Sequence, residues 1–270
     1  MVVMQRCWYL HVRDCGPEGF LAEANYTDTF IDQSLILEVE RKTLVIKSAQ
    51  LEVRRGKPEV ASASVGNLVG ITAYFGSGRK LREALGAAPA LLDMASQALT
   101  AVIQAEIFFY QERGFATAAE YEDFWDKTYQ NACVLYSNLD RVEQRFMDYV
   151  KDHQPGRNLF HRYLTTSLDI SGEKSQICGH LMDSFHEMTL SLNLDQDYQI
   201  QKASASMLRC PDAVCREALA RVPGLEGMDL TTGELKRYHE KCGGSTGCTH
   251  IGQLVQEAAY TLDIYQKNKQ

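Results

Sequence analysis

One internal repeat constrains the fold of this chain more than any other sequence feature. Residues 26–55 align with residues 181–210 at a constant offset of 155. With a two-residue shift, the same register continues through residues 65–70 and 222–227. One register that holds across several blocks predicts a divergent tandem duplication. Six positions of the first block are identical, namely Asp28 and Asp183, Phe30 and Phe185, Leu35 and Leu190, Leu37 and Leu192, Lys47 and Lys202, and Arg54 and Arg209.

Each copy shows the pattern of two strands followed by helices. Residues 34–40 and 43–49 are typical of strands around a short turn, and residues 189–194 and 199–208 repeat them. Strands first and helices after favour an α+β unit with an antiparallel sheet. The predicted helices cover residues 61–68, 79–85 and 90–111 in the first copy and residues 212–221, 233–241 and 249–265 in the second.

A different kind of segment lies between the copies. Gly114 ends one helix, and Thr117 with Glu120 forms a capping box for the next. Apolar and aromatic residues then recur at helical spacing as far as Pro155, which predicts one long amphipathic helix. Such a stripe is typical of a core or a subunit interface, so we expect it to bury Phe124, Trp125, Leu135, Leu139 and Phe146 within the chain, against a protein partner or in a homodimer.

The expected domains follow from this layout. Residues 1–112 form a first, degenerate α+β repeat, residues 113–154 form the connecting helix, and residues 155–270 form a second α+β repeat. The predicted fold class is therefore α+β, with a tandem duplication of an antiparallel sheet and its helices.

Composition excludes several classes of partner. The 270 residues are 45% hydrophobic and 23% charged, as in a soluble globular protein. No apolar run approaches the roughly 20 residues of a membrane span. Charged residues interrupt the first 14 residues, which are therefore not typical of a signal peptide, so the eight cysteines favour reduced thiols in a cytoplasm. A net charge of −7 disfavours binding to nucleic acid or to an anionic membrane.

A glycine-rich stretch with two thiols opens the last predicted helix. It contains Cys242 and Cys248, and His250 follows at once. A thiol at a helix N-terminus is biased toward the thiolate, which binds metal or attacks a substrate. The glycines allow the backbone to approach whatever lies beside Cys248. In the alternative interpretation Thr249 caps the helix and the cysteines are small apolar fillers.

The two copies differ in their metal-ligating residues. In the alignment, Cys210 faces Arg55, Cys248 faces Leu91 and His250 faces Asp93, so only the second copy carries a set of soft ligands. Thiolates with imidazoles suit zinc, an iron–sulfur cluster or copper(I) rather than magnesium or calcium. The predicted metal ligands are Cys178, His186, Cys210, Cys215, Cys248 and His250; His180, Asp183 and Cys242 are further candidates, and Cys7, Cys15 and Cys133 are assigned to structure.

Two family resemblances are carried by these residues. The first resemblance is to the IscU/NifU-type iron–sulfur cluster scaffolds. It rests on the order of three features: Cys178-Gly179, then a strand pair that ends at Cys210, then Cys248 before an amphipathic helix. The resemblance implies that these three cysteines hold a cluster. In this chain His180, Arg209 and Gly247 stand where the scaffolds have Asp, Gly and His. The block formed by residues 247–251 (Gly-Cys-Thr-His-Ile) also resembles an uncharacterised bacterial domain family of unknown function. That resemblance implies no activity and favours Cys215, Cys248 and His250 as the site.

Three classes of function are consistent with these features. The first is a metal- or iron–sulfur-binding protein with its site in the second repeat and an iron–sulfur cluster or zinc as cofactor. The second is a thiol-dependent sulfur-transfer enzyme in which Cys248 is the nucleophile and His250 or His239 its base. The third is a noncatalytic structural or partner-binding protein that uses the aromatic helix as its interface.

Overall fold

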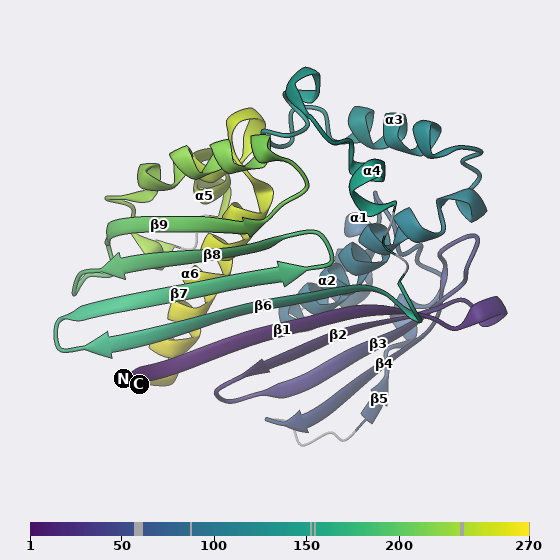
Figure 1. The fold of residues 1–270 in the computed structure, drawn as a ribbon. Helices are drawn as coiled ribbons and strands as arrows, with labels where there is room; N and C mark the ends of the chain where they lie inside the picture. The colour runs from purple at the N-terminus through teal and green to yellow at the C-terminus, as the bar shows by residue number, and fades with distance from the viewer. Residues whose placement is uncertain (57–61, 87, 152, 154, 233–234, 270) are drawn as a thin grey trace. The chain divides into compact units, whose positions relative to one another are not determined.

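The computed structural model of the protein describes residues 1–56, 62–86, 88–151, 153, 155–232 and 235–269. Its strands follow the order β5-β4-β3-β2-β1-β6-β7-β8-β9 (Figure 1). The neighbouring pairs within β2–β5 and within β7–β9 are antiparallel, as the sequence predicts. The strands are β1 (Val2–Asp14), β2 (Phe20–Asp28), β3 (Asp32–Val39), β4 (Ile46–Arg55), β5 (Ser62–Ser64), β6 (Asn158–Ser171), β7 (Lys174–Asp183), β8 (Glu187–Leu194) and β9 (Ile200–Arg209).

The helices follow the strands in each half of the chain. No helix among the residues described is long and apolar enough to cross a membrane. The α-helices are α1 (Gly78–Leu85), α2 (Pro89–Ala105), α3 (Ala118–Thr128), α4 (Phe146–Val150), α5 (Leu235–Cys242) and α6 (Thr249–Lys269). Short 3-10 segments are η1 (Gly16–Glu18), η2 (Gly66–Leu68), η3 (Glu106–Phe108), η4 (Tyr110–Arg113), η5 (Leu139–Arg141), η7 (Leu230–Thr232) and η8 (Gly244–Thr246), and a longer one is η6 (Ala213–Leu225).

The chain divides into two compact units built from interleaved segments. One comprises Met1–Arg6, Glu122–Asp152 and Leu164–Gln270, and the other comprises Cys7–Tyr121 and His153–Tyr163. The sequence instead predicts consecutive domains with boundaries at residues 112 and 154, of which residue 154 lies outside the described part. The units differ from these domains because β1 and β6 each contribute residues to both.

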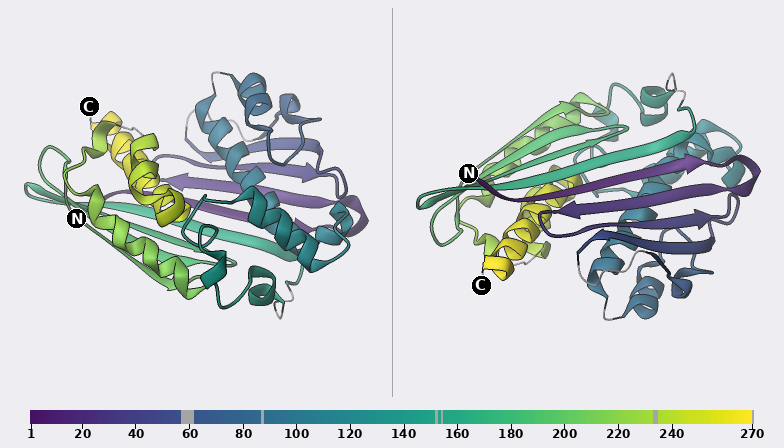
Figure 2. Two further views of the ribbon diagram at one scale, coloured as in Figure 1. Left: turned by 90° about the horizontal axis from the view of Figure 1, so that it is seen from above. Right: turned by 90° about the horizontal axis from the view of Figure 1, so that it is seen from below.

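A long helix packs on the strands within each unit. In one unit α2 contacts β2 and β3, and in the other α6 contacts β7 and β8 (Figures 1 and 2). Buried residues of β2 and β8 alternate with half-buried or exposed ones, as expected where one face of an antiparallel sheet packs against a helix. The buried side chains of α6 include Ile251, Leu254 and Val255. This packing fixes the first turn of α6 beside the end of β7.

The strand pairs β3–β4 and β8–β9 share irregularities as well as topology. Register shifts fall between Asp32 and Gln33 and between Glu38 and Val39 in one pair. In the other pair they fall between Glu187 and Met188 and between Asn193 and Leu194, at the same offset of 155. The turn between β8 and β9 is one residue shorter than the turn between β3 and β4. The offset between matching residues of β4 and β9 is therefore 154.

This shorter turn corrects two pairs of the alignment. Arg209 donates to the Asp183 and Ser184 carbonyl oxygens at 2.6 and 2.8 Å. Arg55, and not Arg54, makes the same bonds to the carbonyl oxygens of Asp28 and Thr29, at 2.6 and 2.7 Å. Lys47 correspondingly matches Gln201, not Lys202. A constant offset of 155 is therefore wrong beyond the turn.

The central helix is the largest error of the sequence interpretation. The capping box is present, since the Glu120 N–H donates to Thr117 Oγ1 at 3.2 Å and the Glu120 carboxylate accepts from the Ala116 N–H at 2.7 Å. However, α3 ends at Thr128, and the chain continues through turns to the short helix α4. The Val134 N–H bonds to the Gly247 carbonyl oxygen at 2.9 Å, outside any helix. Of the five side chains expected to be buried, only Leu135 is; Phe124, Trp125, Leu139 and Phe146 are half-buried.

Other predicted elements are changed more modestly. Residues 62–68 form β5 and η2 instead of a helix, and the predicted residue 61 lies outside the described part of the chain. The helix predicted over residues 90–111 ends at Ala105 and continues as η3 and η4, and the one over residues 212–221 is the 3-10 segment η6. The described part of the helix predicted from residue 233 begins at Leu235, and α1 and α6 lie where the sequence places them.

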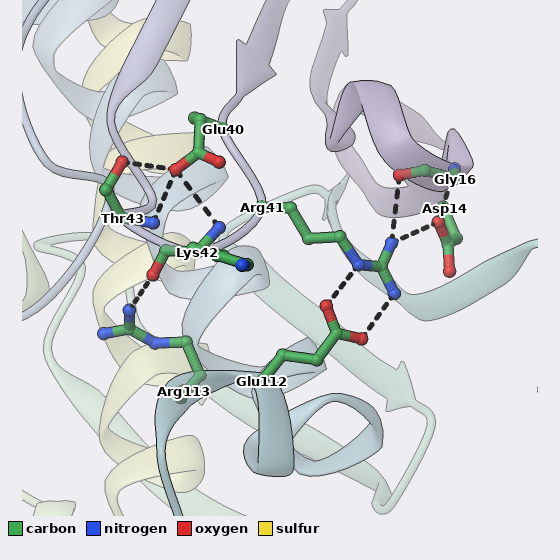
Figure 3. A network of polar contacts seen from close by, with 8 residues as sticks. All are labelled: Asp14, Gly16, Glu40, Arg41, Lys42, Thr43, Glu112 and Arg113. Carbon is green, nitrogen blue, oxygen red and sulfur yellow. Dashed lines mark hydrogen bonds and ion pairs between the residues drawn. The ribbon is translucent and has the colours of Figure 1, made fainter.

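A polar network ties the turns of one unit together. Arg41, in the turn after β3, donates from Nε and Nη2 to the two carboxylate oxygens of Glu112 in η4, and from Nη1 to Asp14 Oδ1 at 2.7 Å (Figure 3). Glu40 accepts bonds from the Thr43 hydroxyl, the Thr43 N–H and the Lys42 N–H, which lower the pKa of its carboxyl from 4.5 to about 2. These contacts hold the turn between β3 and β4 in place.

Candidate metal centre

A buried aspartate shapes the turn after β7. Asp183 has no exposed surface, and its Oδ1 accepts from the N–H groups of Phe185 and His186 at 2.8 and 2.7 Å. The guanidinium of Arg209 holds the carbonyl groups of the same turn. A short polar side chain that bonds to the backbone two and three residues on is a common way to build such a turn. The turn therefore fixes the direction in which residue 186 leaves the sheet.

Two imidazoles meet at this turn. His186 Nδ1 lies 3.2 Å from Asp183 Oδ1. The ring of His250, in the first turn of α6, packs on the His186 ring with 4.2 Å between the centroids. One ligand atom from each of these three residues lies within 4.8 Å of the other two. Segments far apart in the sequence thus bring a carboxylate and two imidazoles to one point.

The glycine-rich turn places Cys248 beside this group. The Cys248 N–H donates to the Cys242 carbonyl oxygen at 2.6 Å. A Cβ at Gly247 would lie 2.1 Å from the same oxygen, so only glycine fits this close approach. The Cys248 sulfur lies 3.9 Å from His250 Nδ1. The sequence predicts that a glycine here allows a close neighbour, and that neighbour is the Cys242 carbonyl oxygen beside Gly247.

Burial raises the pKa of two thiols of this region, Cys248 and Cys215. Burial raises the pKa of Cys248 to about 11, and the N–H groups of Ile251 and His250 offset only part of that effect. Burial also raises the pKa of Cys215 to about 12. The expectation of a thiolate at the helix N-terminus is therefore wrong for Cys248, because desolvation outweighs the helix end.

Not every predicted ligand reaches this region. In β7 the side chains of Ile177 and Leu181 are buried, whereas Cys178, between them on the alternate face, is exposed. His180 shares the face of Cys178 and lies 3.6 Å from Glu187. Cys178 is therefore not brought together with the other candidates.

The remaining candidates lie at the ends of β9, η6 and α5. The Cys210 sulfur donates to the Asp212 carbonyl oxygen at 3.2 Å, and the Cys215 N–H donates to the same oxygen at 3.1 Å. Cys242 is buried at the end of α5. The His239 ring lies 3.4 Å from Gln256 Oε1 and occupies the space above Gly252, where a Cβ would lie 2.6 Å from its Nδ1.

Sequence reasoning underestimated two residues. Asp183 is only a further candidate in the sequence, where it matches Asp28, but its buried carboxylate contacts His186, and one ligand atom of each of Asp183, His186 and His250 lies within 4.8 Å of the others. Cys133 is assigned to structure, yet its charge would raise the pKa of both Cys215 and Cys248, so it belongs to their surroundings. The alignment marks Asp183, whereas no motif marks Cys133, which lies between the two copies.

The first half of the chain repeats the turn without the imidazoles. Asp28 Oδ1 accepts from the N–H groups of Phe30 and Ile31 at 2.6 and 2.7 Å. Ile31 occupies the position of His186, and the Tyr26 hydroxyl donates to Asp28 Oδ2 at 2.6 Å. Both halves therefore have this turn, but only in the second half does a histidine, His186, follow the aspartate at this position.

Comparison with known proteins gives a family of unknown function. A family model described as "Protein of unknown function (DUF2889)" matches residues 168–262, a little over a third of the chain. No curated protein and no solved structure matches. The match includes Asp183, His186, Cys210, Cys215, Cys248 and His250, and it excludes Cys133. It agrees with the resemblance carried by residues 247–251, whereas the IscU/NifU resemblance finds no support.

Proposed function

We propose that this protein binds a transition-metal ion, with zinc as the best fit, through Asp183, His186 and His250. The observation that carries the proposal is that ligand atoms of all three lie within 4.8 Å of one another. Zinc bonds to imidazole nitrogen and carboxylate oxygen are about 2.0–2.2 Å long, which places two tetrahedral ligands about 3.4 Å apart. Small side-chain rotations bring the three atoms to that spacing.

The donor set favours zinc over other common ions. Magnesium and calcium take oxygen ligands, whereas two imidazoles suit zinc, iron(II) or copper. Three protein ligands leave a fourth position, which a water molecule or the neighbouring Cys248 can occupy. A water ligand gives an open site of the catalytic type, and a thiolate gives a closed one.

The surroundings also suit a metal-bound histidine. Metal-ligating histidines commonly direct their second ring nitrogen to a carboxylate, which fixes the ring and its tautomer. Asp183 stands in that relation to His186, at 3.2 Å. It can therefore serve as a ligand itself or hold His186 for the metal.

We test the proposal with the metal content and zinc affinity of purified protein. His186→Ala and His250→Ala are expected to lower zinc affinity by tenfold or more, in line with the loss of a ligand. His180→Ala is the matched control, because His180 is a partly exposed histidine of the preceding strand, on its other face. Equal zinc affinity in all four proteins would refute the proposal.

We further infer that the site arose in one copy of a duplicated unit. The support is the shared strand order, the register shifts at one offset, and the arginines that hold equivalent turns. A duplicated unit can keep a turn in both copies and acquire ligands in one. This inference does not depend on the resemblance to IscU-type iron–sulfur scaffolds.

A partner-binding role is the second candidate. The segment from α3 onward carries half-buried aromatic side chains, with Trp125 stacked on Tyr129 at 4.9 Å and Tyr129 on Tyr136 at 5.4 Å. Tryptophan and tyrosine are enriched at protein interfaces. If this segment forms a homodimer interface, Trp125→Ala should shift the molar mass measured by light scattering from dimer to monomer, and a monomeric wild type would exclude the homodimer.

A further inference from the structure

The turn that carries His186 is contacted by the short helix α4. The Tyr149 hydroxyl of α4 donates to the Phe185 carbonyl oxygen at 3.0 Å. The Phe146 ring packs on the Phe185 ring in a T-shaped arrangement, with 5.1 Å between the centroids. Phe185 is 1% exposed and directly precedes His186 in the chain. Helix α4 therefore contacts the turn at the residue next to a proposed metal ligand.

The peptide unit between Phe185 and His186 is held at both of its polar groups. Its N–H, which belongs to His186, donates to Asp183 Oδ1 at 2.7 Å. Its carbonyl oxygen, which belongs to Phe185, accepts from the Tyr149 hydroxyl. A peptide unit is planar, so one bond at each of these groups limits its rotation. The two bonds together fix the place from which the His186 side chain leaves the backbone.

Contacts with α3 hold α4 itself in place. A helix of five residues is too short to be stable alone, so its position depends on its neighbours. Arg145, directly before α4, pairs with Glu122 at 3.3 Å and with Asp126 at 2.5 Å. The Met147 N–H also donates to Glu122 Oε1 at 3.2 Å. These contacts keep the Tyr149 hydroxyl at the turn.

A buried aspartate holds the segment that leads into α4. Asp212 is 6% exposed, and its Oδ2 accepts from the N–H groups of Glu143 and Gln144 at 3.0 and 3.1 Å. Its Oδ1 accepts from the Val214 N–H at the start of η6, at 2.9 Å. The chain is therefore fixed both before α4 and within it, which allows α4 to restrain the turn.

The similar turn of the first half has no such support. Phe30, at the position of Phe185, is 41% exposed, and no described residue donates a side-chain hydrogen bond to its carbonyl oxygen. Asp28 still accepts from the N–H groups of Phe30 and Ile31, so the turn forms without a covering helix. The contacts from α4 thus accompany the turn that carries a histidine and are not required to form a turn of this kind.

We propose that Tyr149 is a positioning residue of the metal site. Its hydroxyl restrains the peptide unit before His186 and so keeps the imidazole beside Asp183 and His250. Groups that orient metal ligands without touching the metal contribute to metal affinity. The inference rests on the proposed metal site. Because coupling between two sites is reciprocal, metal binding in turn stabilises the contact of α4 with the turn.

The zinc affinity of the full chain tests this role. We expect Tyr149→Phe, which removes only the hydroxyl, to bind zinc roughly three- to tenfold more weakly than the wild type. Phe146→Leu keeps the hydroxyl, loses the ring contact with Phe185 and should also weaken binding. Tyr26→Phe is the matched control, because its hydroxyl bonds at 2.6 Å to Asp28 in the similar turn of the first half. Urea unfolding of each variant checks that it is folded.

Two further measurements separate positioning from a loss of stability. At saturating cobalt(II), the visible absorption of the bound ion reports the arrangement of its ligands. We expect this spectrum to change in Tyr149→Phe and to match the wild type in Tyr26→Phe, since lower stability alone leaves the spectrum of the bound ion unaltered. Zinc should also slow hydrogen exchange in residues 146–150 of the wild type, and this protection should be smaller in Tyr149→Phe.

The result that would overturn the inference is distinct from failure of the metal site. If His186→Ala loses zinc affinity while folded Tyr149→Phe and Phe146→Leu keep wild-type affinity and cobalt spectra, the metal site stands and Tyr149 does not position it. An equal loss of affinity in Tyr149→Phe and Tyr26→Phe, with unchanged spectra, would also contradict positioning. If the wild type and His186→Ala bind zinc equally, the proposed site is wrong and this inference fails with it.

Discussion

At the scale of single residues, Cys248 is held in a position that suits coordination better than nucleophilic attack. Its sulfur is buried, its pKa is raised to about 11, and two backbone N–H groups point at it. A nucleophilic cysteine needs a thiolate at neutral pH, which a neighbouring cation or base usually provides. A metal ion instead displaces the proton when it binds. A raised pKa and a buried sulfur are therefore consistent with the ligand role that we propose.

Alkylation rates test this assignment. In metal-free protein at pH 7.5, iodoacetamide should modify the exposed Cys15 and Cys178 much faster than Cys248, because Cys248 is both buried and protonated. Peptide mass spectrometry over a time course measures each rate. If Cys248 were alkylated first, it would be an activated nucleophile, and the result would support the thiol-enzyme interpretation instead.

Gly247 gives a second test at this scale. Replacing it with alanine would place a methyl group 2.1 Å from the Cys242 carbonyl oxygen, so the turn must open. We expect Gly247→Ala to lower the free energy of unfolding by about 2–4 kcal/mol and to weaken metal binding. Gly66→Ala is the control, since a Cβ there meets no atom within 4 Å. Equal urea midpoints for the two variants would contradict this account.

At the scale of elements, the turn after β3 links acid stability to a particular carboxylate. The pKa of Glu40 is lowered from 4.5 to about 2 by the Thr43 hydroxyl and by two backbone N–H groups. A lowered pKa means that ionised Glu40 stabilises the fold above about pH 4.5 and that this contribution is lost as the pH falls toward 2. The effect belongs to the turn, because all of its donors lie within three residues of Glu40.

A substitution separates this effect from general acid unfolding. Glu40→Gln should be less stable than the wild type at pH 7, and the difference should shrink between pH 4.5 and 2. Glu83→Gln, which removes an exposed acidic side chain of α1, should show a smaller difference at pH 7. Urea unfolding at a series of pH values measures both. A difference for Glu40→Gln that stays constant with pH would exclude the ionised carboxylate as its cause.

The segment from α3 to α4 shows where helical periodicity misleads. Trp125 is half-buried and Leu135 is buried, so the two substitutions should differ. We expect Trp125→Ala to cost about 1–2 kcal/mol and Leu135→Ala about 2–5 kcal/mol in the free energy of unfolding. Urea unfolding of the single variants provides the comparison. A cost for Trp125→Ala above that for Leu135→Ala would mean that the aromatic side chain is buried in solution, for instance by a partner.

The elements that the sequence predicts correctly are those governed by local signals. Helices α1 and α6 carry a clear amphipathic pattern, and the capping box at Thr117 forms as expected. Residues 129–145 carry a helical pattern too, but the Val134 N–H bonds to Gly247 more than a hundred residues away. A long-range hydrogen bond of that kind leaves no local signal. The strands β1, β2, β6 and β7 were not anticipated either, although alternating burial in β1 follows a period of two.

The candidate site was predictable only in part for the same reason. The alignment of the two copies marks Asp183, Cys248 and His250, since the repeat allows each to be compared with its counterpart. It does not show that Cys178 points to the exposed face of β7, because the register of β7 was not predicted. It also cannot mark Cys133, which lies outside both copies. Comparing the two aligned segments can identify candidate ligands only among the residues that the alignment covers.

At the scale of the whole molecule, two similar turns, one in each half of the chain, provide matched experiments. Arg55 and Arg209 hold equivalent turns through equivalent carbonyl groups, but only the turn of Arg209 leads to His186. Arg55→Met and Arg209→Met should each lower the free energy of unfolding by about 1–3 kcal/mol, because the carbonyl groups of each turn lose a charged donor. Only Arg209→Met should also weaken zinc binding, as measured by calorimetry. Weaker zinc binding in Arg55→Met alone would contradict the assignment of the site to the second half.

The central claim is that Asp183, His186 and His250 bind a metal ion, and X-ray absorption at the zinc edge tests it most directly. Protein loaded with one equivalent of zinc should show nitrogen or oxygen ligands at about 2.0–2.1 Å with the outer-shell scattering of imidazole, and at most one sulfur at about 2.3 Å. His186→Ala should lose part of the imidazole scattering. A spectrum with four sulfur ligands and no imidazole, or a wild type that binds no zinc, would contradict the account.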